Sequence, residues 1–362
     1  MHVRRIRAGL IRLGKRGILV FQLERRERVL TGYATCPVKS LELNHLQKRK
    51  RVWVSYCRGS SYDGLMGVER VRRFLHVLVR GVALVSIPVI LLSAYVLYDQ
   101  ERFIFPGLYL PKSVGDFALF PGVRAVTIET SDDESLQAFT TVAEGTHPPF
   151  VALIFHGNGE TAETQNFIPF FKKVGIPALT FDYRGFGHSS GWPSEEGIYR
   201  DAEAAAEKVR ELTGLPYSRF VVLGNSIGSG PAAYIAGKIQ PRALILIAGF
   251  KDFGELVGGI PPYSFLRFGL RYQFPVTKHL EALTGQCVVL AHGKRDQTIP
   301  FWHLSQIAKA LPATTSVSLL ESEIAGHNDI FYKVEDQLIE KTRACLGMQR
   351  EDSPGNVPLP VT

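Results

Sequence analysis

Cysteine is scarce in this sequence. The 362 residues include four cysteines, which are Cys36, Cys57, Cys287 and Cys345. They show neither the C-x-x-C spacing of metal and redox motifs nor the density of a disulfide-stapled secreted domain. The cysteines therefore give little indication of a metal site or a redox centre, and we expect the protein to work without a metal or an organic cofactor.

Acidic residues are missing from the start of the chain, where the first is Glu24. Residues 1–80 contain 19 Lys or Arg and 5 Asp or Glu, a net charge of +14, whereas the other residues contain 23 and 29, a net charge of −6. The overall charge of +8 thus belongs to the N-terminal region. Because a nucleic-acid-binding domain carries its own basic surface, we expect no nucleic-acid partner for the main domain.

Residues 81–98, GVALVSIPVILLSAYVLY, lack any charge, and 18 apolar residues reach the lower length limit for a transmembrane helix. A buried core helix is the alternative, but the run has no polar stripe. Residues 66–80 form a basic flank before it, and Asp99 and Glu101 follow. The positive-inside rule then places the N-terminus in the cytoplasm and the rest on the extracytoplasmic or lumenal side. No small-x-small cleavage site follows, so we expect an uncleaved signal anchor.

The two ends of the chain lack a folding pattern. Residues 1–65 have no sustained hydrophobic period, which fits a basic arm, a transit peptide or an extension that is not translated. We hypothesise that translation begins at Met66, since "MGVERVRRFLHVLVRG" already forms a short basic region before the apolar run. Residues 347–362 are rich in Pro and Gly and are predicted to be a disordered tail.

Residues 99–346 alternate strand-like and helix-like segments, which predicts an α/β domain with helices on both faces of the sheet. The first two strands are joined by "SDDES" and should form an antiparallel hairpin, whereas the later ones should run parallel. We therefore expect about eight strands in a mostly parallel sheet. The predicted strands are RAVTIET, LQAFTTVA, FVALIFHG, PALTFDYRG, RFVVLGNS, ALILIAGF, CVVLAHG and SVSLLESE.

A serine follows one of these strands in "GNSIG", residues 224–228. The stretch fits G-x-S-x-G between a strand and a helix, where the glycines allow a turn sharp enough to present the serine above the sheet. A glycine-rich turn is by itself often only a turn. Ser226 is nevertheless our candidate nucleophile because of the residues that accompany it.

Asp296 follows a later strand in "GKRDQTIP", and His327 follows the last strand in "GHNDIF". Each of them could be an ordinary loop residue. The order Ser226, Asp296, His327 is nevertheless that of α/β-hydrolases, and all three positions lie at carboxyl ends of parallel strands. The backbone N–H groups of Ile227 and Asn158 are the candidate oxyanion hole. Two other histidines that close strands, His156 and His292, are interpreted as loop supports.

An alternative of another class is a dinucleotide-binding enzyme. "GNGETA", residues 157–162, fits G-x-G-x-x-A after a strand, and Asp182 ends the next strand. That interpretation puts an antiparallel hairpin before the first strand of the motif and leaves Ser226, Asp296 and His327 unexplained.

The segments "HGNGE", "DYRGFGHSSGWPSEEG", "GNSIGSG", "GKRDQTIP" and "GHNDIF" resemble the membrane-anchored α/β-hydrolase domain proteins, which include bud-emergence-type hydrolases and protein palmitoyl-thioesterases. The resemblance covers about residues 100–346. It implies an α/β-hydrolase fold with Ser226 as nucleophile, His327 as base and Asp296 as its orienting acid.

Residues 251–285 lie where this fold commonly carries its lid, and they contain six aromatic residues. These could roof an apolar pocket or simply pack on the core. With the site tethered near a membrane, we expect hydrolysis of acyl esters or thioesters. An aminopeptidase-like amidase is the alternative within the fold, and a non-catalytic membrane-anchored binding module is the alternative if the three residues are misaligned. The oligomeric state is not predicted. The six aromatic residues are Phe253, Tyr263, Phe265, Phe268, Tyr272 and Phe274.

Overall fold

The computed structural model describes residues 6–13, 16–23, 68–110, 122–259 and 263–348. The chain divides into two units, residues 1–83 and residues 84–362. In the first unit, β1 (Ile6–Leu13) and β2 (Arg16–Leu23) form an antiparallel hairpin that the sequence pattern did not predict. The rest of the predicted N-terminal extension, residues 24–65, and most of the predicted tail, residues 349–362, lie outside the described residues.

Helix α1 extends from Val68 to Tyr98 and is therefore longer than the uncharged run at 81–98. The basic flank continues the helix because its Arg, Val and Leu residues are compatible with helical backbone. Within the described chain, α1 is the one helix that is long and apolar enough to cross a membrane, over the 26 residues Arg73–Tyr98. Its apolar side chains, such as Leu84 and Leu91, are exposed, as a membrane-spanning helix requires.

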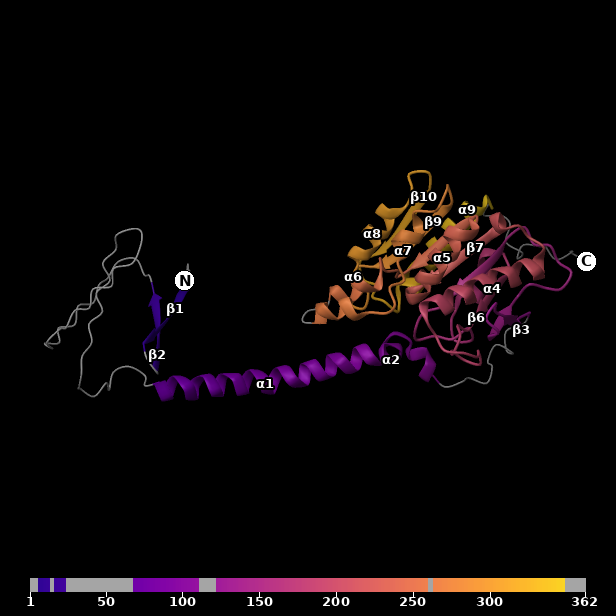
Figure 1. Cartoon of the computed structure of the whole chain (residues 1–362). Coiled ribbons are helices and arrows are strands. Elements are labelled where there is room, and N and C mark those ends of the chain that lie inside the picture. Colours follow the sequence, from indigo (N-terminus) through magenta and orange to yellow (C-terminus); the bar gives the residue numbers. More distant parts are fainter. Residues whose placement is uncertain (1–5, 14–15, 24–67, 111–121, 260–262, 349–362) are drawn as a thin grey trace, which may run out of the picture. The chain divides into compact units, whose positions relative to one another are not determined.

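The second unit contains an eight-stranded sheet with the order β10-β9-β8-β7-β5-β6-β4-β3 (Figure 1). β3 and β4 form the predicted antiparallel hairpin, β4 also pairs antiparallel with β6, and the remaining neighbours are parallel. The expected strand count and the expected mostly parallel direction are thus confirmed. The strands are β3 (Arg124–Glu129), β4 (Ser135–Thr140), β5 (Val151–Phe155), β6 (Ala178–Phe181), β7 (Phe220–Asn225), β8 (Ala243–Ile247), β9 (Cys287–Gly293) and β10 (Ser316–Ser322).

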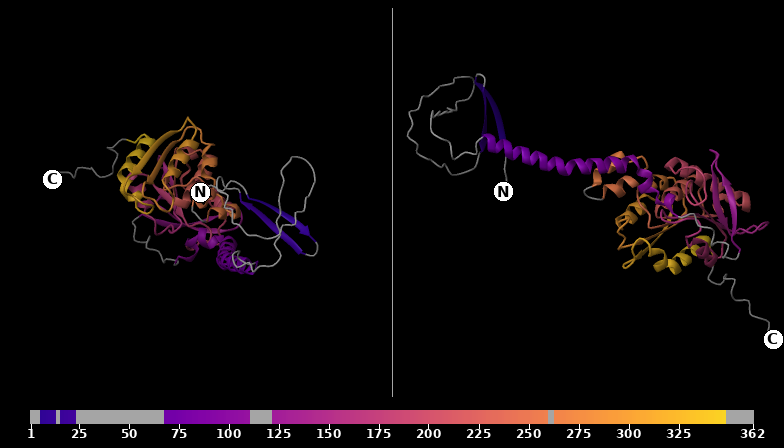
Figure 2. Two further views of the ribbon diagram at one scale, coloured as in Figure 1. Left: turned by 90° about the vertical axis from the view of Figure 1, so that its left-hand side faces the viewer. Right: turned by 90° about the horizontal axis from the view of Figure 1, so that it is seen from below.

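Helices cover both faces of this sheet, and the core is accordingly in two layers (Figure 2). In β5, Leu153 and Phe155 pack in the layer under α4 and α5, while Ala152 and Ile154 pack in the layer under α3 and α9. Successive side chains of a strand point to opposite faces, so a continuous apolar strand serves both layers. The longer helices are α3 (Phe167–Val174), α4 (Glu195–Thr213), α5 (Ser229–Ile239), α8 (Trp302–Ala310) and α9 (Ile330–Leu346).

Shorter elements lie at the ends of the strands. In the chain, α1 is followed by α2 (Gln100–Ile104) and the 3₁₀ turn η1 (Pro106–Tyr109). The predicted lid insertion folds as α6 (Phe253–Gly258), η5 (Tyr263–Gly269) and α7 (Val276–Leu280). Two further 3₁₀ turns, η3 (Tyr217–Arg219) and η4 (Ser226–Gly228), flank β7.

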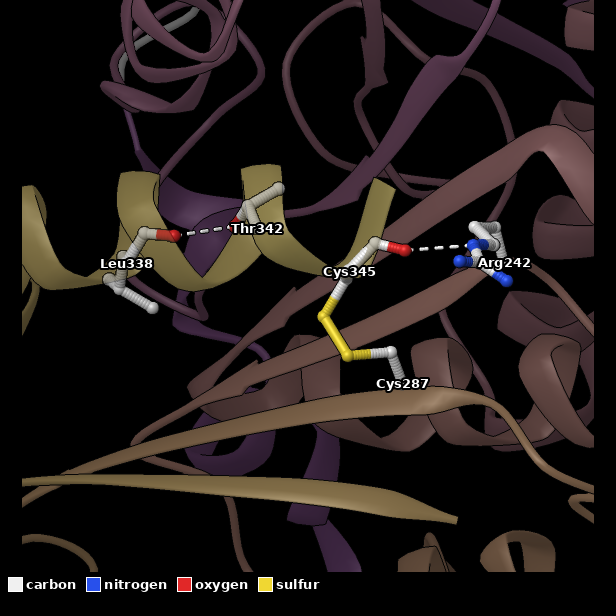
Figure 3. The surroundings of a disulfide bond; sticks show 5 residues. All are labelled: Arg242, Cys287, Leu338, Thr342 and Cys345. Atoms are coloured by element: carbon white, nitrogen blue, oxygen red, sulfur yellow. Dashed lines mark hydrogen bonds between the residues drawn. A yellow bond between two sulfur atoms is a disulfide. The ribbon is translucent and has the colours of Figure 1, made fainter. Parts of the chain in front are cut away.

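A disulfide joins Cys287, at the start of β9, to Cys345, at the end of α9 (Figure 3). The Cα atoms are 5.6 Å apart, and the Cys345 carbonyl accepts a hydrogen bond of 2.8 Å from Arg242 Nε. The sequence analysis missed this pair because the two cysteines are 58 residues apart and no local motif marks them. It ties the C-terminal helix covalently to the sheet.

Candidate active site

Ser226 lies at the sharp turn between β7 and α5, where η4 joins strand to helix. Its φ is +53°, a left-handed conformation that non-glycine residues rarely adopt outside functional turns. Glycine is required on both sides of the serine. A Cβ at Gly224 would lie 2.6 Å from Ala232 Cβ, and one at Gly228 would lie 2.3 Å from the Phe155 carbonyl oxygen. This close packing explains the G-x-S-x-G spacing.

The structure brings Ser226, His327 and Asp296 together in one chain of hydrogen bonds. Ser226 Oγ is 2.9 Å from His327 Nε2, and His327 Nδ1 is 2.7 Å from Asp296 Oδ2. An ionised carboxylate only accepts hydrogen bonds, so Nδ1 of His327 carries the proton. Nε2 is then free to accept the hydroxyl proton of Ser226. The arrangement can therefore move a proton from the serine to the histidine.

Asp296 is held by more groups than His327 alone. Its Oδ1 accepts hydrogen bonds from the backbone N–H groups of Thr298, at 2.9 Å, and Ile299, at 2.7 Å. Burial of Asp296 opposes its ionisation, but the neighbouring His292 and His327 and the Ile299 N–H together lower its pKa below the ordinary value. The carboxylate is thus charged throughout the neutral range.

A second histidine supports this carboxylate. His292 is buried at the end of β9, and its Nε2 lies 2.8 Å from the Ile299 carbonyl and 3.3 Å from Asp296 Oδ2. Because a carbonyl oxygen only accepts hydrogen bonds, Nε2 of His292 carries a proton. The Ile299 carbonyl oxygen and Asp296 Oδ2 share this donor. The sequence predicted a loop support at this position, and the geometry shows which loop His292 contacts.

His303, on α8, lies deeper in the same region and is fully buried. Its Nδ1 accepts a hydrogen bond of 3.1 Å from the Lys251 backbone N–H. Burial, with smaller contributions from His292 and Lys251, lowers its pKa to about 4. His303 is therefore neutral at physiological pH. No sequence motif marked this residue.

The loop that supplies Asn158 faces Ser226 across the site. Asn158, Ile227, Ser226 and His327 all line one cavity of about 630 Å³. The Asn158 side chain is engaged elsewhere, since its Nδ2 donates a hydrogen bond of 2.5 Å to the Ile104 carbonyl. The predicted oxyanion donors are backbone groups, so this orientation leaves their assignment unchanged.

Glu160 connects that loop to the nucleophile turn. Its Oε2 accepts hydrogen bonds from the Gly157 N–H, at 2.7 Å, and from Asn225 Nδ2, at 3.2 Å. One carboxylate thus holds the loop after β5 against the residue that precedes Ser226. The sequence analysis did not single out this role, although Glu160 is the last residue of "HGNGE".

The remaining walls of the cavity are mainly apolar. They come from α2, from the loop after β8, from α6, and from the starts of α3 and α9. Of the aromatic residues expected to form a roof, Phe253 lines the cavity, whereas Phe274 and Tyr272 pack in the core and Phe265 and Phe268 are exposed. The insertion therefore serves partly as roof and partly as core. The apolar wall residues include Phe103, Ile104, Phe250, Leu256, Ile299 and Phe331.

The dinucleotide-binding alternative does not fit. Asp182, which would have to reach a ribose, is 1% exposed and accepts a hydrogen bond of 2.7 Å from the Ala162 N–H through Oδ1. Its carboxylate therefore supports the loop from inside. Among the residues that the structure describes, no group of three or more His, Cys, Asp or Glu is arranged to hold a metal ion.

Residues 151–329 match the family model of the alpha/beta hydrolase fold. An uncharacterized protein of Mycobacterium tuberculosis is 28% identical over 69% of this chain and 89% of its own length. The alpha/beta hydrolase domain-containing protein 17C of Xenopus tropicalis is 30% identical over 56% of this chain and 64% of its own length.

Solved structures show the same fold. An alpha-beta hydrolase from Vibrio vulnificus has a TM-score of 0.55 at 22% identity, over 67% of this chain and 94% of its own. An esterase from Pyrococcus furiosus has a TM-score of 0.53 at 18% identity, over 66% and 95%. The chain is therefore an α/β-hydrolase fold protein, as predicted. More particularly, it is similar to the α/β-hydrolase domain-containing proteins, and the fold and these similarities together support a hydrolase.

Proposed function

We propose that this protein is a serine hydrolase that cleaves acyl esters or thioesters through an acyl-enzyme intermediate. The observation that carries the proposal is the hydrogen-bonded chain from Ser226 through His327 to Asp296, which opens on a cavity with several apolar walls. A nucleophile, a base and a group that orients the base, all within hydrogen-bond reach, are the parts that acyl transfer needs.

We infer the roles of these residues from their hydrogen bonds. His327 Nε2 accepts the proton of Ser226 while Oγ attacks the acyl carbon, and Asp296 stabilises the imidazolium that forms. The backbone N–H groups of Asn158 and Ile227 hold the negative oxygen of the tetrahedral intermediate. His327 then gives its proton to the leaving alcohol or thiol. In the second half, the same histidine activates a water molecule that cleaves the acyl-enzyme.

Apolar walls favour an acyl group over a peptide as the bound portion of the substrate. Phe103, Phe253 and Leu256 provide hydrocarbon surface on which an acyl chain can be buried, at about 0.8 kcal/mol for each methylene. The Pyrococcus furiosus neighbour is described as an esterase. We therefore place ester and thioester cleavage ahead of amide cleavage for this site.

The direct test uses a fluorophosphonate probe, which labels an activated serine covalently. We expect the full chain to be labelled and the Ser226→Ala variant to remain unlabelled. A matched control is Ser229→Ala, because Ser229 is buried one turn further along and lies outside the cavity lining. Equal labelling of the wild type and Ser226→Ala would overturn the proposal.

We further propose that α1 anchors the protein as a single-pass signal anchor, with the hydrolase domain on the extracytoplasmic or lumenal side. The basic residues before the apolar run support this orientation. The Cys287–Cys345 disulfide supports it independently, because disulfides persist in oxidising compartments. A reporter fused after residue 346 should be exposed to added protease where the domain faces the cell exterior. It should be protected where the domain faces a lumen. A reporter in the cytoplasm would refute the orientation.

A further inference from the structure

The lid insertion is joined to the end of the apolar helix. Gly269, the last residue of η5, lies so close to α1 that a Cβ on it would be 2.8 Å from Leu97 Cδ1. The buried Gln100 donates from Nε2 to the Gly269 carbonyl at 2.9 Å and accepts from the Arg271 N–H at 2.9 Å. One amide side chain thus fixes η5 to the residues that follow the helix.

A second set of contacts reinforces this attachment. The Glu101 carboxylate accepts a hydrogen bond of 2.6 Å from the Tyr272 hydroxyl and pairs with Arg271 Nη1 at 3.1 Å. Arg271 Nη2 also donates to the Tyr98 carbonyl at 2.8 Å. Since Tyr98 is the final residue of α1, the lid is held at the position where the chain leaves the apolar helix.

This attachment sets the depth of η5. Leu97 belongs to the last turn of the uncharged run, so whatever packs against it lies at the edge of any bilayer that α1 crosses. In this segment Phe265 is 48% exposed and Phe268 is 81% exposed. The Arg267 guanidinium lies 4.8 Å from the centre of the Phe268 ring. Exposed aromatic rings beside an arginine are typical of segments that sit at a membrane surface.

The lid and the helix exit also meet at the active-site cavity. Phe103 and Ile104 of α2 line it on one side, and Phe253 and Leu256 of α6 line it on another. α6 packs directly against η5. Lipid chains next to η5 would thus lie beside two walls of the cavity that holds Ser226.

We propose that η5 inserts Phe265 and Phe268 into the acyl chains of the leaflet that holds the C-terminal end of α1. The enzyme then draws acyl lipid substrates directly from that leaflet. The inference rests on the proposed hydrolase activity and on α1 as anchor. It commits to bilayer lipid as the occupant of this surface, because the exposed rings continue the apolar surface of α1 through the contact between Gly269 and Leu97.

Photo-crosslinking in the full chain tests the location. p-Benzoylphenylalanine replaces Phe268, Leu91 near the middle of the uncharged run 81–98, or Leu319, which is 47% exposed on edge strand β10. Each protein is placed in phosphatidylcholine vesicles, illuminated and examined by mass spectrometry for lipid adducts. We expect adducts at positions 268 and 91 and none at 319.

The outcomes separate the two proposals. Adducts at 91 without adducts at 268 overturn the insertion of η5 and leave the anchor intact. Absence of adducts at both positions overturns both. Crosslinks from 268 to another protein or to a second copy of the chain overturn lipid as the occupant.

Activity gives a second readout, which uses the double variant Phe265→Ser/Phe268→Ser. Neither residue lines the cavity. We expect hydrolysis of a palmitoyl thioester embedded in vesicles to fall about tenfold or more, with hydrolysis of soluble p-nitrophenyl acetate unchanged. Leu319→Ser should alter neither rate. Equal loss on both substrates, or no loss on the vesicle substrate, would overturn the proposal. Failure of fluorophosphonate labelling would instead overturn the proposed hydrolysis, and the crosslinking result would still stand.

Discussion

Two regions enclose the cavity, and they are built differently. The catalytic side consists of loops at the ends of β7, β9 and β10, where Ser226, Asp296 and His327 are fixed by short hydrogen bonds and close backbone packing. The roof consists of α2 and α6, short helices with few buried residues, beside the exposed rings of η5. On the proposed function, the loops at the strand ends carry out the chemistry, and the roof selects the molecules that reach it. Variants in the first region should therefore change the rate of the chemical step, and variants in the second should change the preference among substrates.

The largest effect should come from the catalytic side. We expect Ser226→Ala and His327→Ala each to lower kcat by about 10⁴-fold or more, and the double variant to lose no more than either single one, because the residues act as one unit. Steady-state kinetics on a soluble ester measures this. Additive losses would show that the two side chains act separately.

Asp296→Asn comes next, with an expected loss of kcat on the order of 10³-fold or more. The amide cannot stabilise the imidazolium, and its NH₂ group favours the wrong tautomer of His327. The pH-rate profile should be measured beside that of Asn166→Asp, which lies in the same cavity lining but outside the hydrogen-bonded chain. Retention of most activity by Asp296→Asn would point to another acid.

Stability should depend on pH through His303. Its folded pKa of about 4 lies below the ordinary value of 6.5, so its contribution is fully present above pH 6.5 and is lost as the pH falls from 6.5 to 4. The loss should be on the order of 3 kcal/mol. Lys251 and His292 disfavour its protonation, and Asp296 favours it.

Denaturant unfolding at several pH values checks this dependence. His303→Gln should flatten the profile between pH 4 and 6.5, whereas His147→Gln, at an exposed position, should leave it unchanged. The same steep profile in both variants would mean that other groups govern acid unfolding.

The smallest effects should come from the roof. Phe253→Ala and Leu256→Ala should lower kcat/KM for octanoyl or longer esters by about tenfold, which is about 1.4 kcal/mol, and leave acetyl esters nearly unaffected. A chain-length series of p-nitrophenyl esters, with aminoacyl amides beside it, makes the measurement. A flat series with faster cleavage of amides would favour the amidase alternative and contradict our interpretation of the roof.

The sequence predicted the sheet and its strands closely, because the central strands are continuous apolar runs and the outer ones alternate apolar and polar residues, as in VALIF of β5 and SVSLLES of β10. β9, for example, begins at Cys287 and ends at Gly293 as expected. The order of Ser226, Asp296 and His327 could be proposed for the same reason, since each follows one of the predicted strands. Local signals were sufficient wherever the structure depends on neighbours in the chain.

Contacts between distant segments could not be predicted in this way. Gln100 binds the backbone near Gly269, 169 residues away, and no periodicity records that pairing. Glu160 and Asn225 meet only because β5 and β7 are neighbours in the sheet. Phe274 is fully buried, whereas Phe268 is exposed. Their burial likewise depends on how the insertion folds and not on residue type.

The disulfide closes a covalent ring around part of the active site. Cys287 and Cys345 are 58 positions apart, and the segment between them contains both Asp296 and His327, while Ser226 lies outside it. Such a ring restricts the unfolded chain by about 4 kcal/mol of conformational free energy. An unfolded molecule with this bond intact therefore keeps Asp296 and His327 within one covalent loop, while Ser226 remains on the open part of the chain.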